Sequence, residues 1–351
     1  MKTLVMTGGG TLGHCLPCLA LLPYLKNSFD RIIYIGSEKG RERKAVEGTL
    51  EYMCIPTTKL KRGMYLSNLA IPFTLLKAVA AANIILKETG ADIVFSKGGY
   101  VSVPVCLAAN QLKIPVICHE SDLTMGLANR LTARKCKYVL TSFETTASKL
   151  DNGVYVGPPI ARSVLAEKKE EAEKVFSLPR NKPVLLVVGG SSGAKALNDF
   201  TVNNIDELLK RYEVLHICGD EHISGVKRKG YRQVGFVKDM ALAYSLSDYA
   251  LSRCGSNTAF ELIARKIPTV FVPLPKKASR GDQIQNADYF FEKGMSVTLK
   301  EEDMSISALE EKLCYLSANR ERFIRNMSKL DPARSLNKMA DIVISTAQFL
   351  D

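Results

Sequence analysis

The side chains best suited to acid–base chemistry in this sequence belong to its few histidines and their neighbours. His14 closes a glycine-rich segment (residues 7–14, TGGGTLGH), and His119 ends an apolar run and is followed by Glu120. A neutral imidazole near pH 7 is a suitable general base for an alcohol, and a nearby helix N-terminus favours that neutral form. We therefore predict His14 or Glu120 as the acid–base group, with a positioning role for His14 left open. His216, inside an apolar run, is predicted to be a satisfied core histidine.

Three glycine-rich segments each follow an apolar run and precede a helical pattern. They are residues 7–14, residues 98–100 (GGY) and residues 189–194 (GGSSGA). Glycine permits a tight turn and lets an anion approach the N–H groups at a helix N-terminus. The first segment also fits G-x-G-x-x-G, the dinucleotide pattern, and a plain tight turn is the simpler alternative. The three segments together predict binding of phosphate groups at sheet edges.

Two further segments combine a turn with polar side chains. Residues 252–261 (SRCGSNTAFE) lead from an apolar run into a helix, and Glu261 there has two interpretations. It either completes a capping box with Thr258, three residues earlier, or accepts both hydroxyls of a ribose. In residues 281–287 (GDQIQNA), amides and a carboxylate could bind sugar hydroxyls, or they could simply begin a polar helix.

Metal and redox chemistry find little support in the sequence. Cys15 and Cys18 form a single C-x-x-C without a second pair at zinc-like spacing, and two small apolar residues on a helix is the simpler interpretation. The chain has no D-x-D, the pair with which many sugar transferases hold a metal on a diphosphate. We predict no metal ion and no other cofactor, and reduced thiols in a cytosolic setting.

The elements that must position these residues are short apolar strands alternating with helices. The predicted strands are residues 3–6, 32–35, 93–95, 115–118, 138–141 and 154–156, then 184–188, 214–218, 233–237, 249–251, 269–272 and 296–299. Such runs suit parallel sheets buried on both faces, so the fold class is α/β with two doubly wound sheets. Gly157-Pro158-Pro159 marks the joint, and residues 167–174 (EKKEEAEK) predict a solvated helix. Residues 336–350 predict an amphipathic helix that packs back onto the first domain.

The balance of charge favours a polyanionic partner. The net charge is +12, from 48 basic and 36 acidic residues, which suits nucleic acid, an anionic bilayer face or phosphorylated substrates. No apolar run reaches the roughly 20 residues that span a bilayer. Residues 57–77 place basic side chains beside apolar ones, which predicts shallow contact with an anionic membrane surface. A packed helix with a basic rim is the alternative.

The motifs in order resemble one family over essentially the whole chain. They are TGGGTxGH, SKGGYVSVP, CHESD, VVGGSSGA, SRCGSNTAFE and GDQIQNA. This set resembles the bacterial N-acetylglucosaminyltransferases of peptidoglycan synthesis (the MurG family), which form lipid II. The resemblance implies the two-domain GT-B fold and an inverting transfer of GlcNAc from UDP-GlcNAc to the 4-hydroxyl of MurNAc on undecaprenyl diphosphate. It also implies attachment to the cytoplasmic face of the membrane, and no nucleic-acid partner.

The resemblance also implies roles for individual residues. Residues 1–160 with 333–351 would form the acceptor and membrane domain, and residues 161–332 the donor domain. Donor contacts would come from Ser191, Ser192, Gly193, Val237, Gly255, Glu261 and Gln283. Acceptor contacts would come from Gly9, Gly10, Thr11, Gly13, Gly98, Gly99, Tyr100 and Asn129. His14 and Glu120 would be the catalytic pair.

Several residues depart from the family pattern. Leu12 replaces a usual glycine, Ser121 and Asp122 stand where the family has Gln and Asn, and an expected arginine aligns with Ala161, one position before Arg162. The alternatives are a paralogous transferase or epimerase with another substrate, a nucleotide-sugar-binding protein without turnover, and a nicotinamide-dependent oxidoreductase. The third glycine segment and residues 252–261 argue against the oxidoreductase, which needs neither.

Overall fold

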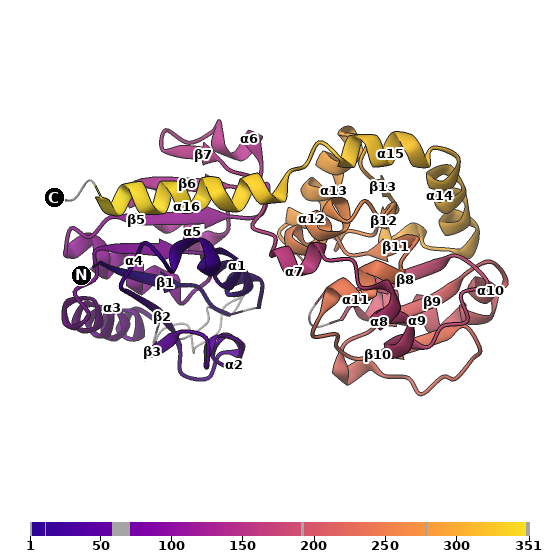
Figure 1. The fold of residues 1–351 in the computed structure, drawn as a ribbon, viewed down its shortest axis with the longest axis horizontal. Coiled ribbons are helices and arrows are strands. Elements are labelled where there is room, and N and C mark those ends of the chain that lie inside the picture. The colour runs from indigo at the N-terminus through magenta and orange to yellow at the C-terminus, as the bar shows by residue number, and fades with distance from the viewer. Residues whose placement is uncertain (1, 11, 58–70, 191–192, 278, 349–351) are drawn as a thin grey trace. The chain divides into compact units, whose positions relative to one another are not determined.

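The computed structural model shows two α/β units, each with one parallel sheet (Figure 1). The first unit comprises Met1–Ala161 and Pro332–Asp351, and the second comprises Arg162–Asp331. The structure describes residues 2–10, 12–57, 71–190, 193–277 and 279–348. The predicted fold class, with two doubly wound parallel-sheet domains, is confirmed.

The first sheet has seven strands in the order β3-β2-β1-β4-β5-β6-β7, all paired in parallel. They are β1 (Thr3–Thr7), β2 (Arg31–Ser37), β3 (Glu51–Ile55), β4 (Ile93–Ser96), β5 (Val116–Glu120), β6 (Tyr138–Thr141) and β7 (Gly153–Tyr155). The central strands are apolar and fully buried, as sheets covered on both faces require. Strand β3 was not predicted from the sequence: in this edge strand only Ile55 is buried, and Ile55 is also its one β-branched residue.

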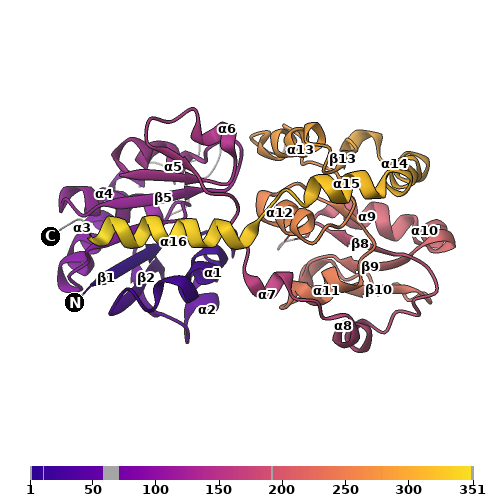
Figure 2. The ribbon, with the colours of Figure 1, turned by 45° about the horizontal axis from the view of Figure 1, so that its top comes forward.

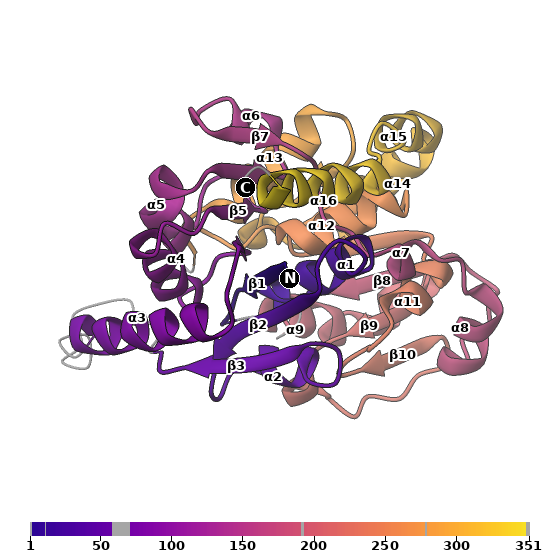
Figure 3. The same cartoon turned by 60° about the vertical axis from the view of Figure 1, so that its left-hand side comes forward.

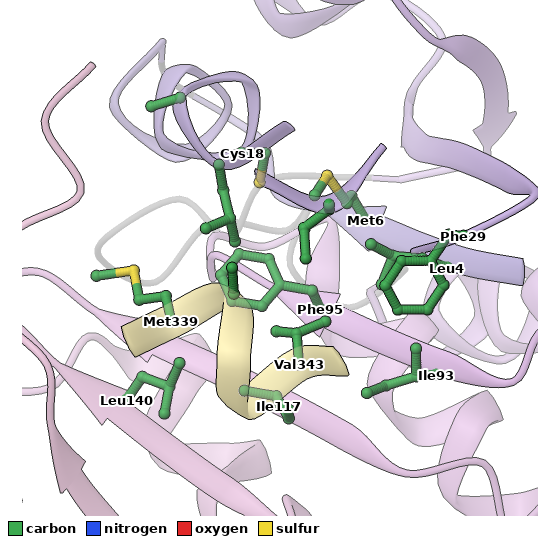
Figure 4. Close-up of a cluster of buried hydrophobic side chains, with 14 of the residues drawn as sticks. Leu4, Met6, Cys18, Phe29, Ile93, Phe95, Ile117, Leu140, Met339 and Val343 are labelled. Carbon is green, nitrogen blue, oxygen red and sulfur yellow. The ribbon is translucent and has the colours of Figure 1, made fainter. Parts of the chain in front are cut away.

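Helices cover both faces of this sheet. They are α1 (Leu16–Leu25), α2 (Arg41–Val46), α3 (Ile71–Glu88), α4 (Ser102–Gln111), α5 (Leu127–Thr132), α6 (Glu144–Ala147) and the C-terminal α16 (Pro332–Gln348). The amphipathic pattern expected over residues 336–350 forms α16, which lies beside α1 (Figure 2). Its Met339 and Val343 join Met6 and Phe95 of the sheet in one buried cluster (Figure 4). The chain therefore returns at its end to complete the first core.

The second sheet has six strands in the order β10-β9-β8-β11-β12-β13, also all parallel. They are β8 (Val184–Val188), β9 (Glu213–Ile217), β10 (Tyr231–Val234), β11 (Tyr249–Ser252), β12 (Thr269–Phe271) and β13 (Val297–Thr298). The predicted strand at 233–237 is wrong at both ends, since β10 begins at Tyr231 and ends before Gly235. Both sheets reverse their strand order beside the first strand of the unit, where doubly wound folds bind ligands.

The helices of the second unit follow its strands in the same alternation. They are α7 (Arg162–Leu165), α8 (Lys169–Phe176), α9 (Lys195–Asn203), α10 (Ile205–Arg211), α11 (Met240–Leu246), α12 (Ser256–Ala264), α13 (Asp282–Glu292), α14 (Ile306–Ala318) and α15 (Arg320–Met327). The charged run at 167–174 forms α8, which is solvated except for Ala172 and Phe176. In the part of the chain that the structure describes, no helix is both long and apolar enough to cross a bilayer.

Candidate active site

The two glycine loops of the first unit lock together at the carboxyl ends of β1 and β4. The N–H of Gly9 donates to the carbonyl of Gly98 at 3.3 Å, and Gly99, at φ 85°, lies so close that a Cβ there would collide with the Gly9 carbonyl. Gly10 packs against the ring of Tyr100, and a Cβ added to Gly10 would lie 2.8 Å from a ring carbon. Glycine is required here by close approach as well as by backbone angle. The structure thus brings together five predicted acceptor residues.

His14 ends the short turn η1 (Leu12–His14), which also contains Gly13. Its ring Nδ1 lies 3.3 Å from the main-chain carbonyl of Lys97. A carbonyl oxygen can only accept, so Nδ1 carries the proton and the lone pair is on Nε2. In this tautomer the basic nitrogen is Nε2. Thr11, another predicted acceptor residue, lies outside the described residues.

Glu120, the other predicted acid–base group, is buried at the end of β5 with its carboxylate surrounded by donors. One oxygen accepts from the N–H of Asp122 at 3.0 Å. The other accepts from the N–H of Gly126 at 2.8 Å and from Nδ2 of Asn129 at 2.9 Å. The carboxylate thereby holds the loop between β5 and α5. This geometry favours His14 over Glu120 as the base, since three donors already occupy the Glu120 oxygens.

Asn129, predicted to bind the acceptor, is buried beside the second glycine loop. Its Nδ2 also donates to the carbonyl of His119 at 3.1 Å. Its Oδ1 is buried and has no hydrogen-bond donor among the described residues, and it lies 2.8 Å from where a Cβ of Gly98 would stand. A buried acceptor without a donor is costly, so this oxygen suits a hydroxyl brought by a ligand or a water molecule.

Lys97 and His119 are two buried polar side chains at the carboxyl ends of β4 and β5. Lys97 is only 2% exposed, and its Nζ donates to Oγ of Ser121 at 2.6 Å. Burial lowers the pKa of Lys97, and burial together with the Lys97 charge holds the pKa of His119 well below its usual value. Lys97 was not predicted as a functional residue. The sequence did contain a signal for it, because Lys97 directly follows an apolar run and precedes a glycine segment.

In the second unit, the glycine loop after β8 lies at the carboxyl edge of the sheet. Gly193, at φ 72°, packs so tightly against the main chain of Cys218 that a Cβ would collide with its carbonyl. Gly255 caps the N-terminus of α12 in an extended conformation, with open space where a Cβ would stand. Val237 is buried in the segment between β10 and α11. Ser191 and Ser192, both predicted donor residues, lie outside the described residues.

Glu261 is not part of a capping box, so that interpretation was wrong. Helix α12 begins at Ser256 with Gly255 as its cap, which places Thr258 inside the first turn. The Glu261 carboxylate instead accepts a hydrogen bond at 2.7 Å from the hydroxyl of Tyr244, a buried side chain of α11. Burial raises the pKa of Glu261 to about 7, and the Tyr244 hydrogen bond opposes that shift. Tyr244 escaped the sequence analysis because nothing local links it to Glu261.

Gln283 and Arg253 both lie after strands of the second sheet, at its carboxyl edge. Gln283 lies in the first turn of α13. Its Oε1 accepts from the N–H of Leu274 at 3.0 Å, so its amide NH₂ remains as a donor group for a ligand oxygen. Arg253 is buried, pairs with Glu301 and donates to the carbonyl of Val272 at 3.0 Å. Arg253 was also missed, although it lies within a segment that the sequence analysis singled out.

The remaining candidates, two cysteines and one histidine, lie in environments that indicate a role in folding rather than in chemistry. Burial raises the pKa of Cys15 and Cys18 to about 12, which keeps both as unreactive thiols and favours the simpler interpretation of the C-x-x-C. His216 is buried with ring nitrogens 2.9 Å from the Tyr231 hydroxyl and 2.9 Å from Oδ1 of Asn198, so it is a satisfied core histidine. Within the described ranges, no three His, Cys, Asp or Glu side chains gather as metal ligands would.

Comparison with known proteins gives matches over nearly the whole chain. Residues 4–141 match the glycosyltransferase family 28 N-terminal domain, and residues 184–345 match the family 28 C-terminal domain. A UDP-N-acetylglucosamine–N-acetylmuramyl-(pentapeptide) pyrophosphoryl-undecaprenol N-acetylglucosamine transferase of Clostridium botulinum is 44% identical, over 98% of this chain and 99% of its own. The Clostridium tetani protein of the same name is 41% identical, over 97% of each chain.

Solved structures resemble the chain in the same way. The crystal structure of Acinetobacter baumannii MurG superposes with a TM-score of 0.75 at 25% identity, covering 98% of this chain and 100% of that one. The UDP-GlcNAc 2-epimerase of Neisseria meningitidis, bound to UDP-GlcNAc, superposes with a TM-score of 0.67 at 14% identity, covering 99% of this chain and 100% of that one. The second match shows only that the fold is shared.

Proposed function

The chain belongs to glycosyltransferase family 28, and from that premise we propose that it transfers GlcNAc from UDP-GlcNAc to a lipid-linked MurNAc-pentapeptide. The acceptor is the 4-hydroxyl of MurNAc on undecaprenyl diphosphate, and the product is lipid II for peptidoglycan. One observation carries the proposal. Each unit has a glycine loop at the carboxyl edge of its sheet. In the first unit the loop ends at the imidazole of His14, and in the second unit the carboxylate of Glu261 lies in the helix after β11, the strand next to β8.

The second unit supplies the donor site. The N–H groups at the start of α12 and the loop at Gly193 suit the diphosphate, because a helix N-terminus attracts negative charge. The Glu261 carboxylate accepts the ribose hydroxyls, held in place by Tyr244. The amide NH₂ of Gln283 donates to the sugar, and main chain near Val237 binds uracil. Dipoles and amides stabilise the departing UDP, so this chemistry assigns no step to a metal ion.

The first unit supplies the acceptor site and the base. The interlocked loops at Gly9, Gly10, Gly98 and Gly99 receive the acceptor's diphosphate on their N–H groups. Nε2 of His14 takes the proton from the acceptor hydroxyl. The hydroxyl oxygen bonds to the anomeric carbon, the bond from that carbon to UDP breaks, and UDP leaves with the electron pair. A single displacement of this kind inverts the anomeric configuration.

The first unit also supplies the membrane surface. Helix α3 (Figure 3) carries exposed apolar side chains, since Phe73, Leu76 and Ile84 are 72%, 69% and 56% exposed. Lys77 and Lys87 of the same helix are exposed as well. Apolar side chains can insert shallowly while lysines attract anionic headgroups. Residues 58–70, which make up most of the segment that the sequence predicts for this contact, lie outside the described residues.

The decisive experiment is incorporation of labelled GlcNAc from UDP-GlcNAc into a lipid I analogue by the purified full chain. Transfer is expected, and transfer only to other lipids would support the paralogue instead. His14→Ala should reduce kcat by about 100-fold or more and leave the dissociation constant of UDP unchanged. An equal loss of UDP affinity would contradict the acceptor-side role of His14. UDP binding without any turnover would identify a silent binding protein.

A further inference from the structure

A buried lysine stands at the meeting point of three loops in the first unit, and the reaction as proposed gives it no role. Lys97 follows β4 and is 2% exposed. Its N–H donates to the carbonyl of Thr7 at 2.8 Å, which ties it to the end of β1. Its Nζ donates to Ser121, which follows β5. Lys97 therefore joins the loops after β1, β4 and β5, all at the carboxyl edge of the sheet.

The ammonium of Lys97 is poorly compensated for a buried charge. The Ser121 hydroxyl is its one hydrogen-bond partner among the described residues, although an ammonium can donate three hydrogen bonds. None of the ion pairs in the described part of the chain includes Lys97. Glu120 and Asp122 are near enough to favour its charged form, but neither carboxylate is hydrogen-bonded to Nζ, and the Glu120 oxygens accept from other donors instead. Burying an ammonium with so few partners costs stability, which suggests that another anion completes the site.

The position of Lys97 next to the glycine loops indicates where that anion would bind. Lys97 immediately precedes Gly98 and Gly99, and its Cβ lies 3.2 Å from where a Cβ of Gly8 would stand. Its main-chain carbonyl is the group that accepts from His14. A positive charge in a low-dielectric interior acts over several ångströms, so it raises the potential of the loop without direct contact. The N–H groups of the loop alone carry only partial charges, whereas a diphosphate carries full ones.

We propose that Lys97 is a specificity residue of the acceptor site, whose buried ammonium provides the fixed positive charge that selects a diphosphate-bearing acceptor at the glycine loops. This inference rests on the proposed function, because it assigns the diphosphate to the acceptor. The role differs from that of a structural cross-link between β4 and β5, in which the hydrogen bond rather than the charge would matter.

Two substitutions in the full-length chain separate charge from cross-link. Lys97→Gln removes the charge but keeps an NH₂ group that can donate to Ser121, whereas Ser121→Ala keeps the charge and removes the cross-link. The proposal expects K97Q to raise KM for a lipid I analogue by about 10- to 100-fold, with KM for UDP-GlcNAc unchanged. It expects S121A to change both constants by less than about threefold. The reverse order of effects would overturn the proposal.

A second measurement does not depend on turnover. With the donor site saturated by UDP, inorganic pyrophosphate is titrated into the wild type and K97Q by calorimetry, and the variant should bind it at least about tenfold more weakly. Equal affinity would overturn the proposal. The melting temperature of K97Q should not fall, since a costly buried charge has gone. A lower melting temperature with equal loss of donor and acceptor affinity would show a structural role instead.

A control variant and the activity of the wild type separate the test of Lys97 from the test of the proposed function. Lys182→Met removes a different lysine, whose Nζ donates to the main-chain carbonyl of Leu209 in the second unit, and it should leave pyrophosphate binding unchanged. Failure of the wild type to transfer GlcNAc would reject the proposed function. Transfer by the wild type with unaltered acceptor KM in K97Q would reject the role of Lys97 alone.

Discussion

The carboxylate of Glu261 should make nucleoside binding depend on pH near neutrality. Burial raises its pKa to about 7, against 4.5 for an ordinary glutamate. Ribose hydroxyls donate hydrogen bonds, so they favour the ionised carboxylate. At pH 6 about one tenth of the unliganded chain carries that form, and at pH 8 about nine tenths, from the distance of each pH to the pKa. The dissociation constant should therefore fall about tenfold between pH 6 and pH 8.

Uridine is the appropriate ligand for this test, because a terminal phosphate such as that of UDP titrates in the same pH range. Calorimetric titrations at pH 6, 7 and 8 would give the dissociation constants. Tyr244→Phe removes the hydrogen bond that opposes the upward shift, so the midpoint should move above that of the wild type. 2′-Deoxyuridine, with one hydroxyl fewer, should show a weaker dependence. His216 does not interfere, since burial lowers its pKa to about 4.

The same group should affect stability, with a definite sign. The pKa of Glu261 is higher in the folded than in the unfolded chain, so its contribution is fully present below pH 4.5 and is lost as pH rises through about 7. The rise of this pKa from 4.5 to about 7 corresponds to about 3 kcal/mol, and solvent reaching the partly exposed side chain reduces this to about 2 kcal/mol. Glu261→Gln should therefore be more stable than the wild type at pH 8 by about 2 kcal/mol. Uridine affinity that is equal at pH 6 and pH 8, or a ten-fold dependence that persists in E261Q, would refute this reasoning.

Three further predictions concern packing, membrane contact and a buried ion pair. Gly99→Ala should cut transfer to the lipid acceptor by at least about tenfold without weakening UDP binding, because a Cβ there would force the two glycine loops apart; kinetics with each substrate varied would test this. The double substitution of Phe73 and Leu76 by Ser should reduce sedimentation with anionic vesicles at low salt, and unchanged binding would place the membrane surface elsewhere. Arg253→Met should lower the free energy of unfolding by about 2 kcal/mol in urea, because the Glu301 carboxylate loses its partner, whereas a neutral result would mean that solvent replaces it.

The sequence predicted most of the fold because parallel strands buried on both faces are continuous apolar runs. The exceptions have a physical reason. Strand β3 is an edge strand in which only Ile55 is buried, and apart from Ile55 its short apolar run lacks the β-branched residues that mark the central strands. Strand β10 was placed too late, because the apolar residues Phe236 and Val237 belong to the loop after the strand rather than to the ladder, which ends at Val234. An apolar run in the sequence indicates burial. It marks a strand only where the buried residues are those of the strand itself.

The candidate site was predictable only where function lies in contiguous segments. The glycine loops and His14 could be named from their order along the chain, because a turn at a helix N-terminus is a local feature. Thr258 and Glu261 show the limit: their spacing fits a capping box, but Gly255 starts the helix and Tyr244, 17 residues earlier, supplies the actual partner.

Which residue pairs with a buried charge depends on how the strands pair in the sheet rather than on closeness along the sequence. Lys97 and Ser121 are 24 residues apart, and they meet because β4 and β5 pair in parallel, so that both strands deliver their next residues to one edge. An anion site assembled in this way leaves only single polar residues at strand ends in the sequence, each of which looks like ordinary loop composition. Polar residues that directly follow the buried strands of a doubly wound sheet should therefore be considered as a set, even when no two of them are close in sequence.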